Sequence, residues 1–345
     1  MLFRSEKLLE DSLIHALEGR FRGEMGMTGR SLENTQARVN LHHSARPAQL
    51  CGKYFNFGVD PYAIDAACAS SLYVVDLACR ALWNGQADVM LAMGVNRSEM
   101  VAMQVGFSQL GAYSPTHRCR PFDKNADGLV VGEGGGALVL KPLSKALQDK
   151  NEIHCLIMGT GLSGDGSHGG LLTPSSRGQV QAMQNAYDAT GIDPISIDYL
   201  ECHGTATPVG DAVEMESTAK IFNRDRKNSL KMGSVKSTVG HCLSAAGMAS
   251  LLKVILAMKK AEFPRTLMDE PCAFLRENQA WIEPVLSAQG WARSNGPRRA
   301  AVSGFGFGGT NAHTIIQEWD PELKWEPEIQ HRSEEHTSEL QSPCN

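Results

Sequence analysis

Residues 65–72 read Asp-Ala-Ala-Cys-Ala-Ser-Ser-Leu, and they set one cysteine, Cys68, among small side chains that let another molecule approach the sulfur. A short β-prone piece, residues 59–64, precedes this stretch. The residues that follow, up to about Trp83, are apolar nearly all round and contain no glycine or proline, which predicts a buried helix. We therefore expect Cys68 at a strand-to-helix junction, where the helix N-terminus favours a thiolate. This stretch alone leaves two equal alternatives, a catalytic nucleophile and an ordinary buried cysteine.

The composition is typical of a globular enzyme rather than of a disordered or fibrous chain. The 345 residues are enough for one large domain or two packed halves. They are 42% hydrophobic and 21% charged and include 34 glycines, which favours a loop-rich α/β protein. The net charge of −5 offers no basic surface for nucleic acid, so we expect no nucleic-acid partner.

The cysteines and the apolar runs indicate the compartment. Nine cysteines are scattered without Cys-x-x-Cys pairs, a pattern typical of reduced thiols rather than of disulfides or a zinc site. The first ten residues carry acidic side chains and lack the apolar core of a secretory signal. The best apolar run, residues 251–258, is interrupted by Lys253, so no membrane-spanning segment is expected. We expect a cytoplasmic protein.

Short apolar runs and helical segments alternate along the chain. Such alternation predicts mixed or parallel sheets covered by helices on both faces. The order of elements recurs in the second half, so we expect a pseudo-duplicated α/β layer fold, although no direct sequence repeat is visible. The expected strands are 87–94, 130–141, 153–158, 197–202, 230–235, 299–303 and 313–318. The expected helices are 1–20, 176–190, 211–222 and 243–260, and residues 144–151 are a short helix or a linker. The expected irregular stretches are 21–50, 106–128 and the glycine-rich segment after 158.

Three further stretches could carry chemistry. His203 leaves an expected strand into a loop of Gly, Thr and Pro, although a lone loop histidine is usually only solvated or hydrogen-bonded. Lys236 and His241 lie in a loop between a strand and a helix, where α/β folds place active sites. A surface lysine followed by a helix-capping turn would give the same sequence pattern. The glycines of residues 304–311 allow close backbone approach to a ligand, or merely form a loop with demanding φ values.

One motif is a decoy. Gly159, Gly161 and Gly164 formally match the dinucleotide fingerprint Gly-x-Gly-x-x-Gly after a strand. That motif must open a helix, so that the pyrophosphate meets the helix N-terminus. Residues 165–170 read Asp-Gly-Ser-His-Gly-Gly and cannot begin a helix, so we reject a nucleotide site. The chain also contains no P-loop, no His-Glu-x-x-His and no paired-carboxylate motif.

Taken together, these stretches resemble the ordered landmarks of β-ketoacyl synthases, from about Tyr54 to about Glu318. The resemblance implies a thiolase-like, layered α-β-α-β-α fold of two pseudo-duplicated halves. Residues 1–150 would form the half with the nucleophilic cysteine, and residues 151–320 the half with two active-site histidines. The cysteine and histidine motifs look more like ketosynthase domains of polyketide or polyunsaturated fatty-acid synthases than like discrete fatty-acid enzymes. The landmarks are residues 65–72, 120–123, 132–134, 203–205, 210–211, 236–241 and 306–313.

The family's chemistry joins an acyl thioester to a malonyl unit by decarboxylative Claisen condensation, giving a 3-oxoacyl thioester. By resemblance, Cys68 takes the acyl chain, and its own N–H with that of Phe307 forms the oxyanion hole. His203 and His241, both neutral, stabilise the enolate, because imidazolium ions beside a cationic lysine would be costly. Lys236 supports the site, and Phe307 also resembles the family's gate. The supporting residues implied are Asp211, Glu214, Gly308, Gly309, Thr205 and Thr207.

The resemblance also implies partners and leaves alternatives. Substrates would be acyl and malonyl thioesters on the phosphopantetheine of an acyl carrier protein or carrier domain, with no bound cofactor or metal, and a homodimer is expected. A non-elongating scaffold subunit usually loses the cysteine or a histidine, whereas this chain keeps Cys68, His203 and His241. A thiolase would have a second cysteine in place of one histidine motif. A cysteine hydrolase would explain neither the second histidine nor the lysine.

Both ends of the sequence depart from the family pattern. Residues 1–46 do not match strongly, and a first, central strand is missing upstream of the cysteine, so we expect a partial sequence with a truncated N-terminal half. Residues 328–345 are polar, lack periodicity and resemble a translated sequencing adapter, so we exclude this tail from the fold. Ala206 stands where many relatives have glycine.

Overall fold

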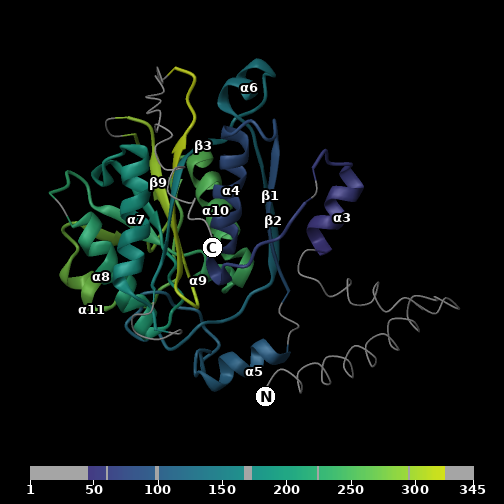
Figure 1. The fold of residues 1–345 in the computed structure, drawn as a ribbon. Helices are drawn as coiled ribbons and strands as arrows, with labels where there is room; N and C mark the ends of the chain where they lie inside the picture. Colours follow the sequence, from purple (N-terminus) through teal and green to yellow (C-terminus); the bar gives the residue numbers. More distant parts are fainter. Residues whose placement is uncertain are drawn as a thin grey trace, which may run out of the picture.

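A computed structural model describes residues 46–59, 61–97, 101–166, 173–223, 225–293 and 296–322. These residues form successive layers (Figure 1). Helices α7 and α8 cover one face of a six-stranded sheet, α4 and α10 cover its other face, and the β1–β2 pair packs on the far side of α4 and α10. The helices are α3 (Arg46–Phe55), α4 (Ser70–Trp83), α5 (Val101–Gln109), α6 (Leu143–Gln148), α7 (Ser176–Thr190), α8 (Pro208–Phe222), α9 (Lys236–Val239), α10 (Ala246–Lys260) and α11 (Ala273–Glu277), with 3₁₀ turns η1 (Ala67–Ala69), η2 (Pro194–Ser196) and η3 (Leu243–Ala245).

The six-stranded sheet has the order β3-β10-β9-β4-β5-β7. β10 is antiparallel to both of its neighbours, whereas β9, β4, β5 and β7 run parallel to one another. The carboxyl ends of β9, β4 and β5 therefore meet at one edge, the edge at which parallel α/β sheets usually bind ligands. The strands are β1 (Met90–Asn96), β2 (Gly134–Leu140), β3 (Cys155–Gly164), β4 (Tyr199–Glu201), β5 (Leu230–Gly233), β6 (Glu262–Phe263), β7 (Ile282–Pro284), β8 (Gln289–Gly290), β9 (Arg299–Gly306) and β10 (Thr310–Glu318).

The expected duplication is visible around the two central helices. Turn η1 leads into α4, and the antiparallel pair β1–β2 follows. Turn η3 leads into α10, and the antiparallel pair β9–β10 follows. The first residue of each turn has a positive φ although neither is glycine, +50° at Ala67 and +44° at Leu243. A positive φ strains the backbone of a residue with a side chain, so the surrounding structure must hold it in place. The two halves therefore share this strained turn as well as the order of their elements.

One hydrophobic core joins the two halves. Side chains of α4, such as Leu72 and Val75, pack in the same cluster as Leu251 and Val254 of α10. The cluster continues onto the sheet through Val302 of β9. A second cluster lies between the sheet and helices α7 and α8. The central helices are therefore enclosed on both sides, which accounts for their nearly continuous apolar sequence.

Several expected elements differ from the structure. Residues 61–66 form no strand, because no neighbouring chain pairs with them among the described residues, so Cys68 follows an irregular segment. Residues 46–50 belong to α3 and residues 106–109 to α5, both expected to be irregular. The expected helix at residues 1–20 lies outside the described residues.

The glycine-rich segment after residue 158 is strand rather than loop. It continues β3 to Gly164, and the rejected nucleotide motif opens no helix. A Cβ at Gly161 would lie 2.1 Å from the carbonyl oxygen of Ala182 in α7. The glycine therefore permits the close contact between α7 and the sheet, which a side chain would prevent. Among the described residues, no helix is long and apolar enough to cross a membrane.

Candidate active site

Cys68 lies in turn η1, directly before the first turn of α4, as expected. The turn is held by Ser70, whose Oγ donates to the carbonyl oxygen of Ala67 at 2.6 Å and accepts from the N–H of Ala66 at 2.9 Å. Strand β9 passes close by, because Gly304 has no side chain to collide with Leu72. Cys68 is buried, with 4% of its surface exposed.

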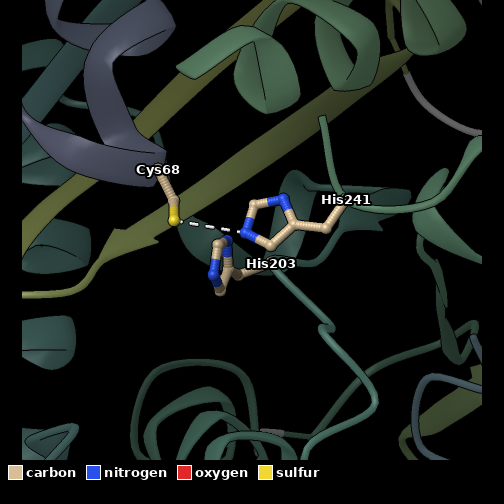
Figure 2. A group of neighbouring side chains, drawn as sticks. All are labelled: Cys68, His203 and His241. Carbon is tan, nitrogen blue, oxygen red and sulfur yellow. Dashed lines mark hydrogen bonds between the residues drawn. The ribbon is translucent and has the colours of Figure 1, made fainter. Parts of the chain in front are cut away.

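His241 faces the cysteine directly (Figure 2). Its Nε2 lies 3.2 Å from Cys68 Sγ, and its Nδ1 accepts a hydrogen bond from the backbone N–H of Leu243 at 3.2 Å. Because Nδ1 is an acceptor, the proton of the neutral ring lies on Nε2. His241 therefore presents an N–H donor to the space beside the sulfur.

His203 completes the cluster from the neighbouring strand. It follows β4, and its ring lies 5.4 Å from that of His241 and 5.8 Å from that of Phe305, centroid to centroid. The sulfur and one nitrogen of each histidine all lie within 4.8 Å of one another. Both oxygens of Glu214 accept from the backbone, one from the N–H of His203 and one from that of Gly204, each at 2.7 Å. This carboxylate fixes where His203 leaves the strand.

Lys236 is buried at the start of α9, which follows β5. Its Nζ donates a hydrogen bond to the carbonyl oxygen of His203, so it ties the end of β5 to the end of β4. Asp211 in α8 accepts from the N–H of Phe122 at 2.6 Å and from that of Ala206 at 3.1 Å. Ala206 has φ +64°, a left-handed backbone conformation that glycine adopts with less strain than alanine.

The protonation states at the site depend on burial and on the charge of Lys236. Burial raises the pKa of the Cys68 thiol, although the N–H of Phe307, the Lys236 charge and the N–H of Cys68 act against it. The prediction of a thiolate is therefore wrong for the free protein. Desolvation of the buried sulfur raises its pKa by more than the nearby N–H groups and charge lower it. Burial and the Lys236 charge hold the pKa values of His203 and His241 well below the ordinary value, so both rings are neutral, as expected. Burial raises the pKa of Asp211 to about 8 and that of Glu214 to about 7.

Phe307 lies in the turn between β9 and β10. Its backbone N–H points at the Cys68 sulfur, and its ring, 37% exposed, lies 5.6 Å from that of Phe107 in α5. Gly308 and Gly309 have φ values of +88° and +79°, which only glycine adopts without strain. Thr205 and Thr207 form a pair after His203, with their Oγ1 atoms 3.0 Å apart.

The cluster does not fit a bound metal ion. Cys68, His203 and His241 are close enough to share one ion, and thiol and imidazole are ligands that zinc prefers. A metal on Nε2 of His241 would require the proton on Nδ1, which already accepts from the N–H of Leu243. That arrangement suits a hydrogen-bond donor better than a metal ligand.

One buried carboxylate beside the site was not predicted. Glu201, at the end of β4, accepts from the N–H of Val235 at 2.6 Å, from Lys253 Nζ at 2.7 Å and from Tyr199 Oη at 2.8 Å. It is fully buried, whereas acidic residues are rarely buried without a partner. The sequence signal that could have revealed Glu201 is an acidic residue at the end of a short apolar strand, two residues before a candidate histidine.

Comparisons with known proteins agree with this geometry. Residues 26–146 match the family model "Beta-ketoacyl synthase, N-terminal domain", and residues 154–269 match "Beta-ketoacyl synthase, C-terminal domain". The chain is 39% identical over 264 residues to one subunit of the phenolphthiocerol/phthiocerol polyketide synthase of Mycobacterium tuberculosis, covering 74% of this chain and 14% of that protein. It is 35% identical over 283 residues to one subunit of the polyunsaturated fatty acid synthase of a Thraustochytrium species, covering 79% of this chain and 10% of that protein.

Solved structures show the same relationship. The ketosynthase from module 6 of the bacillaene synthase of Bacillus subtilis 168 superposes with a TM-score of 0.77 at 37% identity, over 80% of this chain and 50% of that one. A PfaC ketosynthase–chain length factor gives 0.73 at 40% identity, over 79% of this chain and 29% of that one. The matched region therefore spans half or less of these relatives.

The layered fold, with a cysteine and two histidines gathered at one site, is thiolase-like. The chain belongs to the β-ketoacyl synthase family, and its relatives include polyketide synthases, a polyunsaturated fatty acid synthase and the ketosynthase of a bacillaene synthase.

Proposed function

We propose that this chain is an elongating ketosynthase, an acyltransferase that condenses an acyl group with a malonyl unit. The observation that carries the proposal is the convergence of Cys68, His203 and His241, whose reactive atoms lie within 4.8 Å of one another. A thiol with two neutral hydrogen-bond donors beside it suits a reaction in which an enolate attacks a thioester. A hydrolase would need only one of the two histidines.

In the first step the Cys68 sulfur attacks the thioester carbonyl of an acyl group carried on phosphopantetheine. The backbone N–H groups of Cys68 and Phe307 both face the sulfur, so they are placed to donate to the oxyanion that develops on the attacked carbonyl. The sulfur–acyl bond forms, the carrier–sulfur bond breaks, and the thiol proton of Cys68 ends on the departing carrier thiol. A neutral thiol in the free protein is consistent with this proton balance.

In the second step a malonyl thioester takes the place of the first carrier. Loss of its carboxylate as CO₂ leaves an enolate, whose oxygen accepts hydrogen bonds from His203 and from Nε2–H of His241. The enolate carbon attacks the acyl group on Cys68, the sulfur–acyl bond breaks, and a 3-oxoacyl thioester forms. The released cysteine sulfur takes up one proton from solvent, which balances the carboxylate lost as CO₂. Neutral imidazoles suit this step because they donate hydrogen bonds without adding charge beside buried Lys236.

The partners follow from this chemistry. We propose an acyl carrier protein or carrier domain as the donor of both substrates, because curated relatives are large polyketide and fatty-acid synthases. A homodimer and a cytoplasmic location are part of the proposal. The first follows from family resemblance, and the second from the scattered cysteines, which are unpaired throughout the described part of the chain.

Intact-protein mass spectrometry tests the first step. After incubation with an acyl-phosphopantetheine donor, we expect one acyl adduct on the wild type and none on Cys68→Ala, with Cys51→Ala as the matched cysteine control. Adding malonyl-carrier should then remove the adduct and give a 3-oxoacyl carrier with release of CO₂. A folded protein, shown by a cooperative circular dichroism melt, that forms no adduct would contradict the proposal and favour a non-elongating scaffold. Rapid release of free acid would favour a hydrolase.

A further inference from the structure

The buried carboxylate of Glu201 joins three separate segments that carry the candidate active site. Glu201 ends β4, two residues before His203. Its Oε1 accepts from the N–H of Val235, the residue before Lys236, at 2.6 Å. Its Oε2 accepts from Nζ of Lys253 at 2.7 Å. Lys253 lies on α10, the helix that begins just after His241.

The network is closed and almost entirely shielded from water. Glu201 is fully buried, and the side chain of Lys253 is 13% exposed. Tyr199 donates to the same carboxylate at 2.8 Å, and Lys253 Nζ lies 3.0 Å from the tyrosine oxygen. A carboxylate in this position uses both oxygens, so no neighbouring segment can shift without leaving a buried polar group unpaired.

The position of Val235 makes this network relevant to the chemistry. Its N–H is held by Glu201, and the next side chain, Lys236, donates to the carbonyl oxygen of His203. Glu201 and Lys236 therefore both connect the end of β4 to the end of β5, where Ser234 Oγ also donates to the carbonyl oxygen of Gly204 at 3.0 Å and the N–H of Cys202 to that of Gly233 at 2.8 Å. Both histidines must donate to the same enolate oxygen, so their separation depends on this spacing.

We propose that Glu201 is a positioning residue for the condensation step, and that its hydrogen bond to the N–H of Val235 sets the spacing between His203 and the Lys236–His241 segment. This inference rests on the proposed elongating function. Acylation needs the Cys68 sulfur and the Phe307 N–H, which lie on other segments, whereas condensation needs both histidines to reach one enolate oxygen. A change at Glu201 should therefore lower condensation far more than acylation.

A pair of double variants isolates the hydrogen bond from the charge. Glu201→Gln with Lys253→Met removes both charges but keeps an amide oxygen for the N–H of Val235. Glu201→Leu with Lys253→Met removes the same charges and leaves that N–H without an acceptor. The two variants match in charge and nearly in volume, and they avoid the uncompensated lysine that a single substitution would bury.

The readout is the ratio of condensation to acylation, measured on the same preparation by mass spectrometry of the Cys68 adduct and of the product. Because displacement by about 1 Å can cost about 100-fold in rate, we expect the Leu variant to lose about 100-fold in condensation while acylation changes by less than about threefold. The Gln variant should recover most of the ratio. Glu283→Leu removes a carboxylate of β7 that is bonded to Lys231, near the start of β5, at 2.5 Å, and it should leave the ratio unchanged.

Equal ratios in the Gln and Leu double variants would overturn the inference, since a purely structural role lowers both steps through loss of folded protein. NMR resonances of the His203 and His241 rings supply a second reading that does not depend on turnover. If the wild type is acylated but makes no condensation product, the proposed function fails. The ring resonances then decide the inference, which is contradicted if the Leu variant keeps the wild-type shifts.

Discussion

At Cys68, burial and local charge act on the thiol in opposite directions. Burial raises its pKa, whereas the Lys236 charge and the Phe307 N–H lower it. The sequence led us to expect a thiolate at a helix N-terminus, because the pattern of small residues places the cysteine but says nothing of its depth. How deeply a residue is buried depends on the whole fold. The eight residues around Cys68 therefore could not show that its thiol would be desolvated.

Lys236→Met tests the electrostatic argument. Removing this charge takes away an effect that lowers the Cys68 pKa, so the pKa should rise further and alkylation at a fixed pH below it should slow. Each pKa unit corresponds to about a tenfold smaller thiolate fraction. The same change should raise the pKa values of His203 and His241 towards the ordinary value, since the Lys236 charge lowers both. The measurement is the rate of iodoacetamide modification of the Cys68 peptide against pH.

Lys231→Met is the matched control for this charge. Lys231 lies on β5 and pairs with Glu283, so its removal should leave the Cys68 rate unchanged. Faster alkylation in Lys236→Met than in the wild type would contradict the argument. In the wild type, neutral histidines that charge only well below pH 6.5 should give a condensation rate without an imidazole titration between about pH 6 and 8.

At the scale of elements, most expected strands and helices are present because hydrophobic periodicity and glycine positions mark them. The helix at 176–190 ends at Gly191 with φ +65°, a pattern readable from sequence. Two failures have one cause. The piece at residues 59–64 looks β-prone, but its described residues have no partner strand, whereas residues 159–164 look like a loop but pair with β10. Strand formation depends on distant neighbours that a local pattern does not contain.

The glycine in β3 gives a prediction about packing. In Gly161→Ala the new methyl group would lie 2.1 Å from the Ala182 carbonyl oxygen and 2.3 Å from the Ala186 nitrogen, both backbone atoms of α7. Helix α7 must then move away from the sheet, and we expect a loss of about 3 kcal/mol or more in the free energy of unfolding. Gly106→Ala in α5, with no atom within 4 Å of its Cβ position, should be neutral or slightly stabilising. Denaturant unfolding measures both, and equal effects would contradict the packing argument.

At the scale of the whole molecule, the division into halves at residues 1–150 and 151–320 is a prediction from sequence. How the protein unfolds depends instead on the hydrophobic core that the two halves share. Leu72 of α4 is fully buried, and its side chain would meet a Cβ at either Gly247 of α10 or Gly304 of β9. The cysteine-bearing helix is thus packed inside the half that carries the histidines. Two halves sharing one core should unfold together.

Leu72→Ala tests whether the two halves form one cooperative unit. Deleting this side chain should cost about 2–5 kcal/mol, because the cavity lies between elements that cannot collapse onto it independently. Leu256→Ala, on the exposed face of α10 with 56% of its surface accessible, should change stability by less than about 0.5 kcal/mol. Calorimetry should show one transition, shifted as a whole, and hydrogen exchange should speed up equally in β1 and β10. If β10 kept its protection while β1 lost it, the histidine-bearing half would be stable alone, and the spacing between Cys68 and His241 would depend on docking rather than on a shared core.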